Sequence, residues 1–386
     1  MTEISAAERV ARAALTRVVE PDDETVRVLV GRVGAADAWE MVRTGDPALP
    51  PRFRTRVATR VRAAEPERDL ERAAAVGGRL VCPGDSEWPS TLGDLDSLDA
   101  APLALWVRGT SATLADCDRS VAIVGSRAAS AYGIHVSDGL AGGLADRGWA
   151  TVSGGAMGID GAAHRASLAT GTLTVAVLAC GVDVAYPPAH RGLLAAVAST
   201  GLIISEWPPG CSPMRHRFLI RNRLLAALSR GTVVVEAALR SGALSTARWA
   251  QRLGRQTMAV PGPVTSAMSG GCHQLLRETD ATLVTCAAEV LEVVGELGAD
   301  LAPRPQGAAV VRDSLGDEAR RVIEATPVRQ YVTPDRIAVT ASMSPVRVAS
   351  LLNQLCAQGL VEVSDAGFRL SAALRRTRRA GTTDET

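Results

Sequence analysis

The spacing of apolar residues changes along the chain, and each change predicts a different kind of structure. Over residues 10–19 and 26–33, apolar positions recur at the three- and four-residue intervals of amphipathic helices. Prolines at 47, 50 and 51 interrupt this pattern, and a charged helix is predicted from residue 54 to about residue 76. We therefore expect a small helical domain over residues 1–75.

From about residue 80 the apolar residues form short β-rich runs that alternate with helix-like segments. The predicted strands are residues 104–108, 120–124, 150–152, 173–178, 201–205, 231–236, 257–260 and 281–283. The predicted helices are residues 132–147, 160–169, 191–198, 221–228 and 244–252. This alternation is typical of a parallel sheet that helices cover on both faces. The sequence therefore predicts an α/β fold over residues 76–298, with a doubly wound, mainly parallel Rossmann-like sheet.

The C-terminal part follows a third pattern. Residues 299–314 contain two prolines and a glycine and are predicted to be a linker. Predicted helices at 317–325, 334–340 and 344–358 precede a hairpin with strands 360–363 and 368–370. Three helices and a hairpin indicate a winged helix over residues 315–374, and residues 375–386 read as a polar, disordered tail.

Composition excludes several kinds of chemistry. The chain has no lysine, so its 42 basic residues are all arginine, and both Walker-A phosphate loops and Schiff-base enzymes need a lysine. Seven cysteines without a CxxC pair and five scattered histidines indicate neither a metal site nor a disulfide framework. No nucleophile, base and acid form a catalytic motif. We expect a binding protein without cofactor or metal rather than an enzyme.

Hydropathy argues against a membrane protein. No apolar run reaches the roughly eighteen residues that a spanning helix needs, and the first residues lack the apolar stretch of a signal peptide. A cytoplasmic location is expected.

The net charge of +1 hides a local basic patch. No acidic residue lies between Glu206 and Glu236. The arginines inside this stretch are Arg215, Arg217, Arg221, Arg223 and Arg230. An arginine-rich stretch without acids favours an anionic partner.

The first candidate site is the turn formed by Gly125, Ser126 and Arg127, directly after a buried strand. Such a turn can present backbone N–H groups to a phosphate, and an arginine can add a bidentate contact. The residues alone fit a simple strand-to-helix turn equally well. The turn is not GxGxxG, so the dinucleotide fingerprint is missing.

The next strand runs into a glycine-rich segment that begins with Ser153, Gly154 and Gly155. Glycines allow close approach of a ligand to the backbone, and ends of neighbouring strands are where doubly wound folds bind ligands. Asp160 is expected to cap the following helix, and His164 is expected to face the core.

The arginine-rich stretch supplies the second set of candidates, which are Arg215, Phe218, Arg221, Asn222 and Arg223. Sites for single-stranded nucleic acids combine guanidinium groups for the backbone with an aromatic ring for a base. Some of these arginines can instead cap a helix, pair with an acid or hold a dimer contact.

A third set follows the strand at residues 231–236. Ser241 and Gly242 are expected to line an anion pocket, with Ser245 and Thr246 either supporting it or capping the helix that they enter. Glu236, at the edge of the sheet, is expected to orient an arginine of the patch.

Taken together, the ordered motifs VAIVGSR, SGGAMGID, RNR, VVVEA, SGALSTA and VPG over about residues 80–295 resemble the DNA processing protein A (DprA/Smf) family. The resemblance implies a homodimer that binds and protects incoming single-stranded DNA in natural transformation and helps load the RecA recombinase. It also implies a small helix-hairpin-like or sterile-alpha-motif-like N-terminal domain. By matching positions, Gly125, Ser126 and Arg127 would hold phosphates, Arg215 would be basic, and Phe218 would contact a base.

This sequence departs from the family pattern at two positions. Leu219 stands where proline is usual, and Arg215 stands where lysine is common. The first affects loop rigidity, while the second keeps the charge and changes its geometry.

Two other functions stay open at this point. The same fold superfamily resembles nucleotide phosphoribohydrolases, although their PGGxGT loop is absent and residues 241–246 read SGALST. A transcriptional regulator would use the winged helix, where Arg336, Arg347 and Arg369 could touch duplex DNA, although winged helices also bind proteins.

Overall fold

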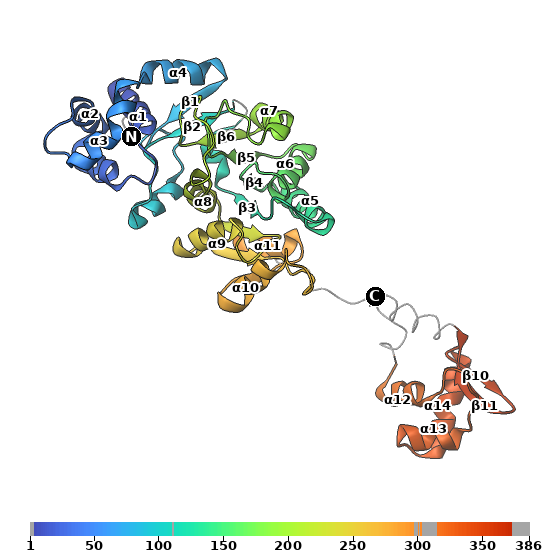
Figure 1. The fold of residues 1–386 in the computed structure, drawn as a ribbon. Coiled ribbons are helices and arrows are strands. Elements are labelled where there is room, and N and C mark those ends of the chain that lie inside the picture. Colours follow the sequence, from blue (N-terminus) through green and yellow to red (C-terminus); the bar gives the residue numbers. More distant parts are fainter. Residues whose placement is uncertain (1–3, 110–111, 297–299, 301, 303–314, 373–386) are drawn as a thin grey trace. The chain divides into compact units, whose positions relative to one another are not determined.

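The buried runs of apolar residues pair into a nine-stranded sheet in the computed structural model (Figure 1), which describes residues 4–109, 112–296, 300, 302 and 315–372. The strands are β1 (Gly78–Val81), β2 (Leu105–Arg108), β3 (Ser120–Val124), β4 (Ala150–Ser153), β5 (Thr174–Val177), β6 (Leu202–Ser205), β7 (Gly231–Val234), β8 (Gln256–Ala259) and β9 (Thr282–Leu283). Their order across the sheet is β1-β2-β6-β5-β4-β3-β7-β8-β9. All eight strands expected between residues 104 and 283 are present.

Most neighbouring strands run parallel. The exceptions involve β2, which pairs antiparallel with β1 on one side and with β6 on the other. Strand β1 was not predicted, because its first two residues are a glycine and an arginine that are only partly buried. The mainly parallel, Rossmann-like α/β fold is confirmed.

Helices cover both faces of the sheet. They are α5 (Ala131–Ala145), α6 (Ile159–Ala169), α7 (Arg191–Thr200), α8 (Arg217–Ala227), α9 (Ala243–Arg252), α10 (Gly270–Glu278) and α11 (Ala287–Val294). Alternate residues of a strand face opposite layers: Val175 and Val177 pack in the cluster that contains α8 and α9, while Ala176 packs in the cluster that contains α7. Burial on both faces explains why these strands are mostly apolar.

The direction of winding reverses between β3 and β7. From β3 the chain builds outward through β4, β5 and β6, and after α8 it returns to place β7 on the other side of β3. The carboxyl ends of β3 and β7 therefore diverge into loops on opposite sides, which leaves a crevice at this edge.

Four helices precede the sheet: α1 (Ala6–Val18), α2 (Glu24–Thr44), α3 (Pro51–Arg62) and α4 (Pro66–Ala75). The single charged helix expected from residue 54 to about residue 76 is wrong, because Pro66 lacks an N–H and starts a new helix at its first turn. The N-terminal helices and the sheet belong to one compact unit, residues 1–303. Buried Arg217 of α8 and Trp207 both donate to Glu20, which follows α1.

Residues 304–386 form a second unit. Its described part contains α12 (Asp317–Ala325), α13 (Pro334–Ala341) and α14 (Pro345–Ala357), followed by the antiparallel pair β10 (Val361–Ser364) and β11 (Gly367–Leu370). These elements match the expected order. Most of the predicted linker at 299–314 and the whole predicted tail at 375–386 lie outside the described residues.

Among the described residues, no helix is both long enough and apolar enough to span a membrane.

Candidate nucleic-acid interface

A pocket of about 850 Å³ lies at the carboxyl ends of β3 and β7, where the winding reverses. It brings together ten of the residues expected from the sequence: Gly125, Ser126, Arg127, Arg215, Phe218, Arg221, Asn222, Ser241, Gly242 and Thr246. They come from three segments far apart in the chain. The fold thus joins most of the three sets of candidates into one site.

The turn after β3 is held in place by two backbone hydrogen bonds. The Ser126 N–H donates to the carbonyl of Glu236 at 2.7 Å, and the Ser126 carbonyl accepts from the N–H of Ile159 at 3.2 Å. A side chain at Gly125 would overlap Ile159. This turn is therefore preorganised, and Arg127 projects from a rigid base.

Arg127 and Phe218 contact each other in the pocket. The guanidinium of Arg127 is 4.6 Å from the centroid of the Phe218 ring. Phe218 also packs against Tyr186, with ring centroids 5.7 Å apart. Arg127 is exposed and makes no hydrogen bond or ion pair within the part of the chain that the structure describes. Its charge is available to a ligand.

The glycines of the segment after β4 make room for protein atoms. A side chain at Gly154 would overlap the guanidinium of Arg221, and one at Gly158, whose φ is +78°, would overlap the carbonyls of Ser126 and Arg127. Gly154 and Gly158 thus have a packing role, and the expectation that this segment admits a ligand to the backbone stays a prediction. Ser153, Gly154 and Gly155 do not line the pocket.

Asp160 does not cap α6 as expected, since Gly158 occupies the cap position. Its carboxylate instead accepts from the N–H groups of Gly154 at 3.1 Å and Ala156 at 3.4 Å. Burial raises the pKa of this carboxyl, and the charge of Arg221 opposes the rise. Asp160 therefore fixes the loop of residues 154–156, which packs against the Arg221 guanidinium.

Arg221 forms part of the buried lining of the pocket. Its Nη1 donates to the carbonyl of Val177, while its Nε has no hydrogen-bond partner among the described residues. Burial lowers the pKa of Arg221 to about 10, against the opposing charge of Asp160. Because this value stays well above neutral pH, Arg221 brings a fixed positive charge to the site.

Two expected site residues have other roles. Arg223 is 3% exposed and lies outside the pocket lining, where it pairs with buried Glu206 at 2.5 Å and donates to the carbonyl of Ala100. Glu236 binds the N–H and hydroxyl of Ser130, the cap of α5, and not an arginine. Ser245 is also outside the lining. His164 faces the core, as expected.

Sequence reasoning missed Arg240, which is exposed and lines the pocket. It directly precedes Ser241 and Gly242, so its place beside an expected anion-binding segment was the signal that could have found it. With Arg127, Arg215 and Arg221 it makes four arginines in the lining, against the single carboxylate of Asp160. Leu219, at the position where proline is usual, is 54% exposed at the same site.

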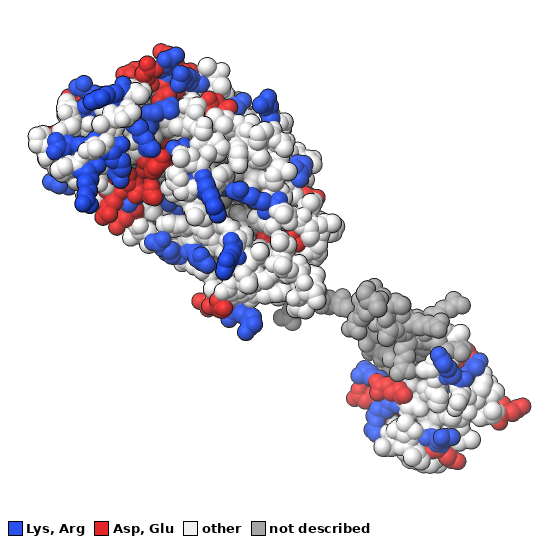
Figure 2. Space-filling view, in the orientation of Figure 1, with Lys and Arg blue, Asp and Glu red and all other residues white. Residues whose placement is uncertain are grey.

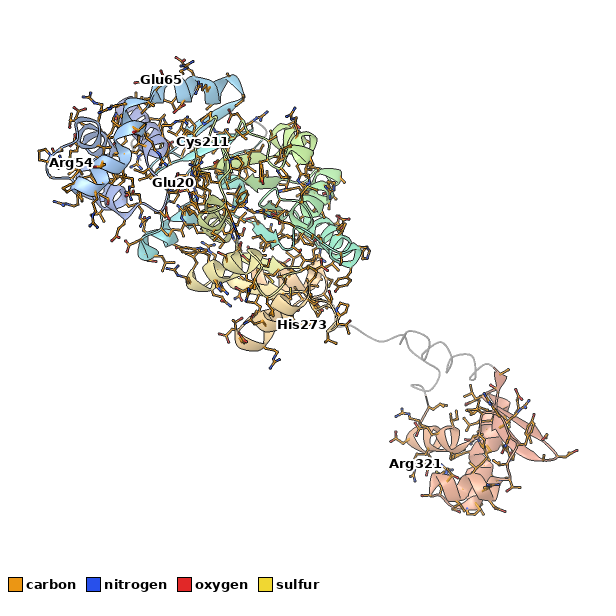
Figure 3. The ribbon with its side chains drawn as sticks, viewed as in Figure 1. Glu20, Arg54, Glu65, Cys211, His273 and Arg321 are labelled. Carbon is orange, nitrogen blue, oxygen red and sulfur yellow. The ribbon has the colours of Figure 1, made fainter. Side chains whose placement is uncertain are left out.

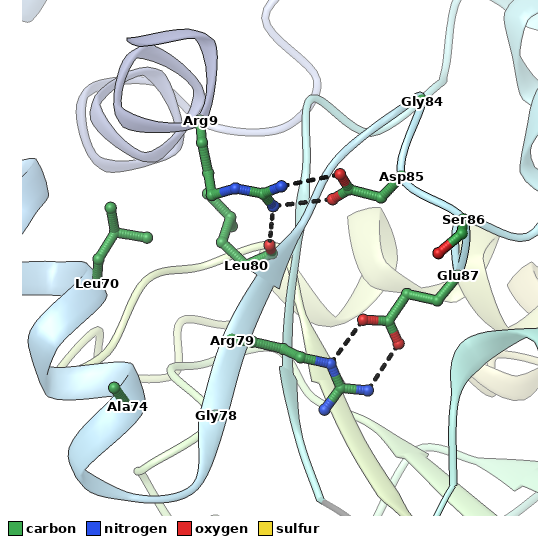
Figure 4. Close-up of a pocket in the computed structure, with 10 residues that line it drawn as sticks. All are labelled: Arg9, Leu70, Ala74, Gly78, Arg79, Leu80, Gly84, Asp85, Ser86 and Glu87. Atoms are coloured by element: carbon green, nitrogen blue, oxygen red, sulfur yellow. Dashed lines mark hydrogen bonds and ion pairs between the residues drawn. The ribbon is translucent and has the colours of Figure 1, made fainter. Parts of the chain in front are cut away.

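A second pocket, of about 720 Å³, lies between α1, α4 and β1 (Figure 4). Its charges are already paired: Arg9 with Asp85 at 2.8 Å, and Arg79 with Glu87 at 2.6 Å. Paired charges of both signs give this pocket no preference for an anion. The arginine-lined pocket is therefore the candidate site.

The same stretch of chain matches a known family. A model described as DNA recombination-mediator protein A matches residues 79–295, which include all of the sheet except Gly78 and every lining residue of the arginine-lined pocket. The chain belongs to this family. The recognition made from the ordered motifs is confirmed.

Relatives extend the match to nearly the whole chain. A protein of Mycobacterium tuberculosis (strain H37Rv), whose name describes it as DNA processing protein DprA, is 47% identical over 373 residues, 94% of each chain. DprA of Streptococcus pneumoniae (strain R6) is 41% identical over 198 residues, 51% of this chain and 69% of its own. An X-ray structure of DprA from Streptococcus pneumoniae has a TM-score of 0.62 and 29% identity, and the match covers 76% of this chain and 100% of that one.

Proposed function

We propose that this member of the DNA recombination-mediator protein A family binds single-stranded DNA in the arginine-lined pocket. The observation that carries the proposal is the pair formed by Arg127 and Phe218 within a pocket that has four arginines and one carboxylate. Guanidinium groups bind phosphates, and an aromatic ring stacks on any base, so this combination suits a nucleic-acid strand of arbitrary sequence.

Single strands fit this arrangement better than duplexes do. The Phe218 ring is half-buried in the pocket wall, so a base must turn its face into the pocket to stack on it. In a duplex both faces of each base are already stacked on neighbours. The first turn of α9 also faces the pocket through Gly242 and Ala243, and a helix N-terminus favours phosphate there.

The role proposed for binding is protection of incoming single strands and loading of the RecA recombinase, by a cytoplasmic homodimer without enzymatic turnover. The description of the family as a recombination mediator supports the RecA step. Asp160 is held by two backbone N–H groups and Glu236 by Ser130, which argues against either carboxylate acting in nucleotide hydrolysis.

The domain division is also part of the proposal: residues 1–75 as a helical domain, 76–298 as the DNA-binding domain, 299–314 as a linker and 315–374 as a winged helix. Three helices followed by the β10 and β11 hairpin support the winged helix. In α14, Arg347 forms an exposed ion pair with Glu318 at 2.5 Å, and this pair does not distinguish duplex DNA from a protein as the partner of this module.

The test compares binding of single-stranded DNA, duplex DNA and RNA of equal length at two salt concentrations, by fluorescence anisotropy. We expect the single strand to bind most tightly, and Arg127→Ala and Arg215→Ala to weaken that binding. Arg43→Ala is the matched control, because Arg43 is an exposed arginine in the last turn of α2 that pairs with Glu40 and does not line the pocket. Equal affinity of wild type and both pocket variants would overturn the proposal.

Two further measurements test the finer statements. Sedimentation or light scattering reports the homodimer, and the lag before RecA filaments form on single strands reports loading. Incubation with nucleoside monophosphates tests the enzyme alternative, since release of free base that is lost in Glu236→Gln would favour a phosphoribohydrolase.

A further inference from the structure

A second basic surface lies on α3, in the N-terminal helical region. No acidic residue occurs between Asp46 and Glu65, while five arginines do, all within α3. The helix buries Phe53 and Val57 in the N-terminal core. Its exposed side carries Arg52, Arg56, Arg60 and Arg62. Figure 2 shows basic side chains gathered over the N-terminal helices, with some acidic ones among them.

Only part of this charge is neutralised within the protein. Arg56 pairs with Asp23, and Arg60 approaches Glu20 at 3.5 Å. Arg52 and Arg62 form no ion pair among the described residues. The exposed side of α3 therefore keeps a net positive charge.

One carboxylate links this surface to the proposed DNA pocket. Glu20 contacts Arg60 of α3 and, at 2.7 Å, Arg217 at the start of α8. Figure 3 places Glu20 where the N-terminal helices meet the sheet. Arg217 lies between Arg215 and Phe218 in the chain, and both of these line the pocket. The C-terminal end of α3 thus adjoins the rim of the pocket through a single side chain.

We propose that α3 is a second contact surface for the same DNA strand, which leaves the pocket past Arg215 and runs along α3. This inference rests on the proposed function. Arg52, Arg56 and Arg60 are four residues apart, so their Cα atoms advance by about 6 Å per step along the helix. That spacing suits successive phosphates of an extended strand. Phe53, the one aromatic residue of α3, is buried, so this surface binds the phosphates and not the bases.

The test variant is the double substitution Arg52→Gln and Arg62→Gln. Neither side chain pairs with an acidic residue among the described residues, so their removal leaves no carboxylate without its partner. Arg56 is kept because Asp23 both pairs with it and caps α2. The matched control is Arg43→Gln with Arg68→Gln, which removes the same charge from exposed arginines that pair with Glu40 and Glu65. Circular dichroism checks that both variants are folded.

Binding is measured with oligothymidylates of about 6 and about 25 nucleotides, one short enough for the pocket alone and one long enough to reach α3. On the long strand we expect the test variant to bind several-fold more weakly than wild type. Its salt slope should be smaller by about 1.4, or roughly 0.7 for each phosphate that the variant no longer binds. On the short strand, and for the control variant on both, affinity stays at the wild-type value.

The possible failures are distinguishable. If wild type binds neither strand, the proposed function fails. If wild type binds both and the test variant matches it on the long strand, the α3 path alone is overturned. An equal loss on both lengths, or a loss on duplex DNA or RNA but not on single-stranded DNA, also overturns it.

Discussion

The guanidinium of Arg127 lies over the ring of Phe218, 4.6 Å from its centroid, and so covers the face on which a base would stack. A cation–π contact at an exposed site contributes about 0.5–1 kcal/mol, whereas stacking of a base contributes roughly 1–3 kcal/mol. A strand that enters can replace the first contact with the second, while Arg127 turns to a phosphate. Under the proposed function, the pair is therefore a preformed site whose two members are expected to separate when DNA binds.

The first prediction concerns this pair. Phe218→Ala should weaken single-strand binding by roughly 1–3 kcal/mol with little change in salt dependence, because stacking is lost and charge is kept. Arg127→Ala should weaken binding and also lower the salt slope by about 0.7. Anisotropy titrations over a range of salt concentrations measure both. The double variant should lose more than the sum of the two single losses, by the energy of the Arg127–Phe218 contact, because each single variant no longer has to break that contact on binding. A fully additive result would argue against the exchange.

The second prediction is that Arg223 stabilises the fold and does not contact DNA. Arg223→Met leaves Glu206, which is 2% exposed, without its partner, and should lower the free energy of unfolding by roughly 3–5 kcal/mol. Affinity of the folded protein for single strands should not change. Urea unfolding and anisotropy test the two halves. Glu206→Leu added to Arg223→Met should recover most of the stability. A DNA-binding defect that persists in this stable double variant would show that Arg223 does contribute to the DNA site.

Arg223 also marks the limit of what the sequence predicts. The acid-free stretch correctly indicates a basic segment, and Arg215 and Phe218 do line the pocket. However, α8 turns its arginines to different sides, and Arg223 meets Glu206 from the end of β6. This pairing depends on tertiary packing, so charge counts along the chain cannot reveal it.

The sheet was easier to predict than the site, for a physical reason. Strands buried on both faces, such as β3 and β5, are apolar after their first residue and stand out from the helices between them. Edge strand β1 lacks this signature. Site residues such as Arg240 carry no periodic signal, and their relevance becomes clear only when the ends of β3 and β7 are placed side by side.

The third prediction tests the packing role of Gly154. A methyl group there would overlap the Arg221 guanidinium, so Gly154→Ala should displace Arg221, destabilise the fold by about 1–3 kcal/mol and weaken DNA binding. Thermal unfolding and anisotropy measure the two effects. Gly139→Ala is the control: this glycine lies within α5 with nothing within 4 Å of the added carbon. It should leave DNA binding unchanged and stabilise the helix slightly, and wild-type behaviour of Gly154→Ala would refute the packing role.

The last prediction concerns His164, which is fully buried under the glycine segment. The Thr174 hydroxyl donates to Thr151, so it accepts from His164 Nδ1 at 2.8 Å, and Nε2 is left without a partner among the described residues. Burial, aided by the charges of His190 and Arg221, lowers the pKa of His164 from 6.5 to about 3. A proton added at Nε2 would be a charged donor with nothing to bind.

The sign of the pH effect follows from this lowered pKa. Between about pH 6.5 and pH 3 the unfolded chain binds a proton at His164 that the folded chain does not, so the free energy of unfolding falls as pH falls through this window. His164→Asn removes the titrating group. From about pH 7 to about pH 4.5, wild type should lose on the order of 2 kcal/mol more than His164→Asn does, as measured by urea unfolding at both values. Equal losses of stability in wild type and His164→Asn would mean that His164 becomes protonated in the folded protein as it does in the unfolded chain. That result would contradict a buried, neutral His164.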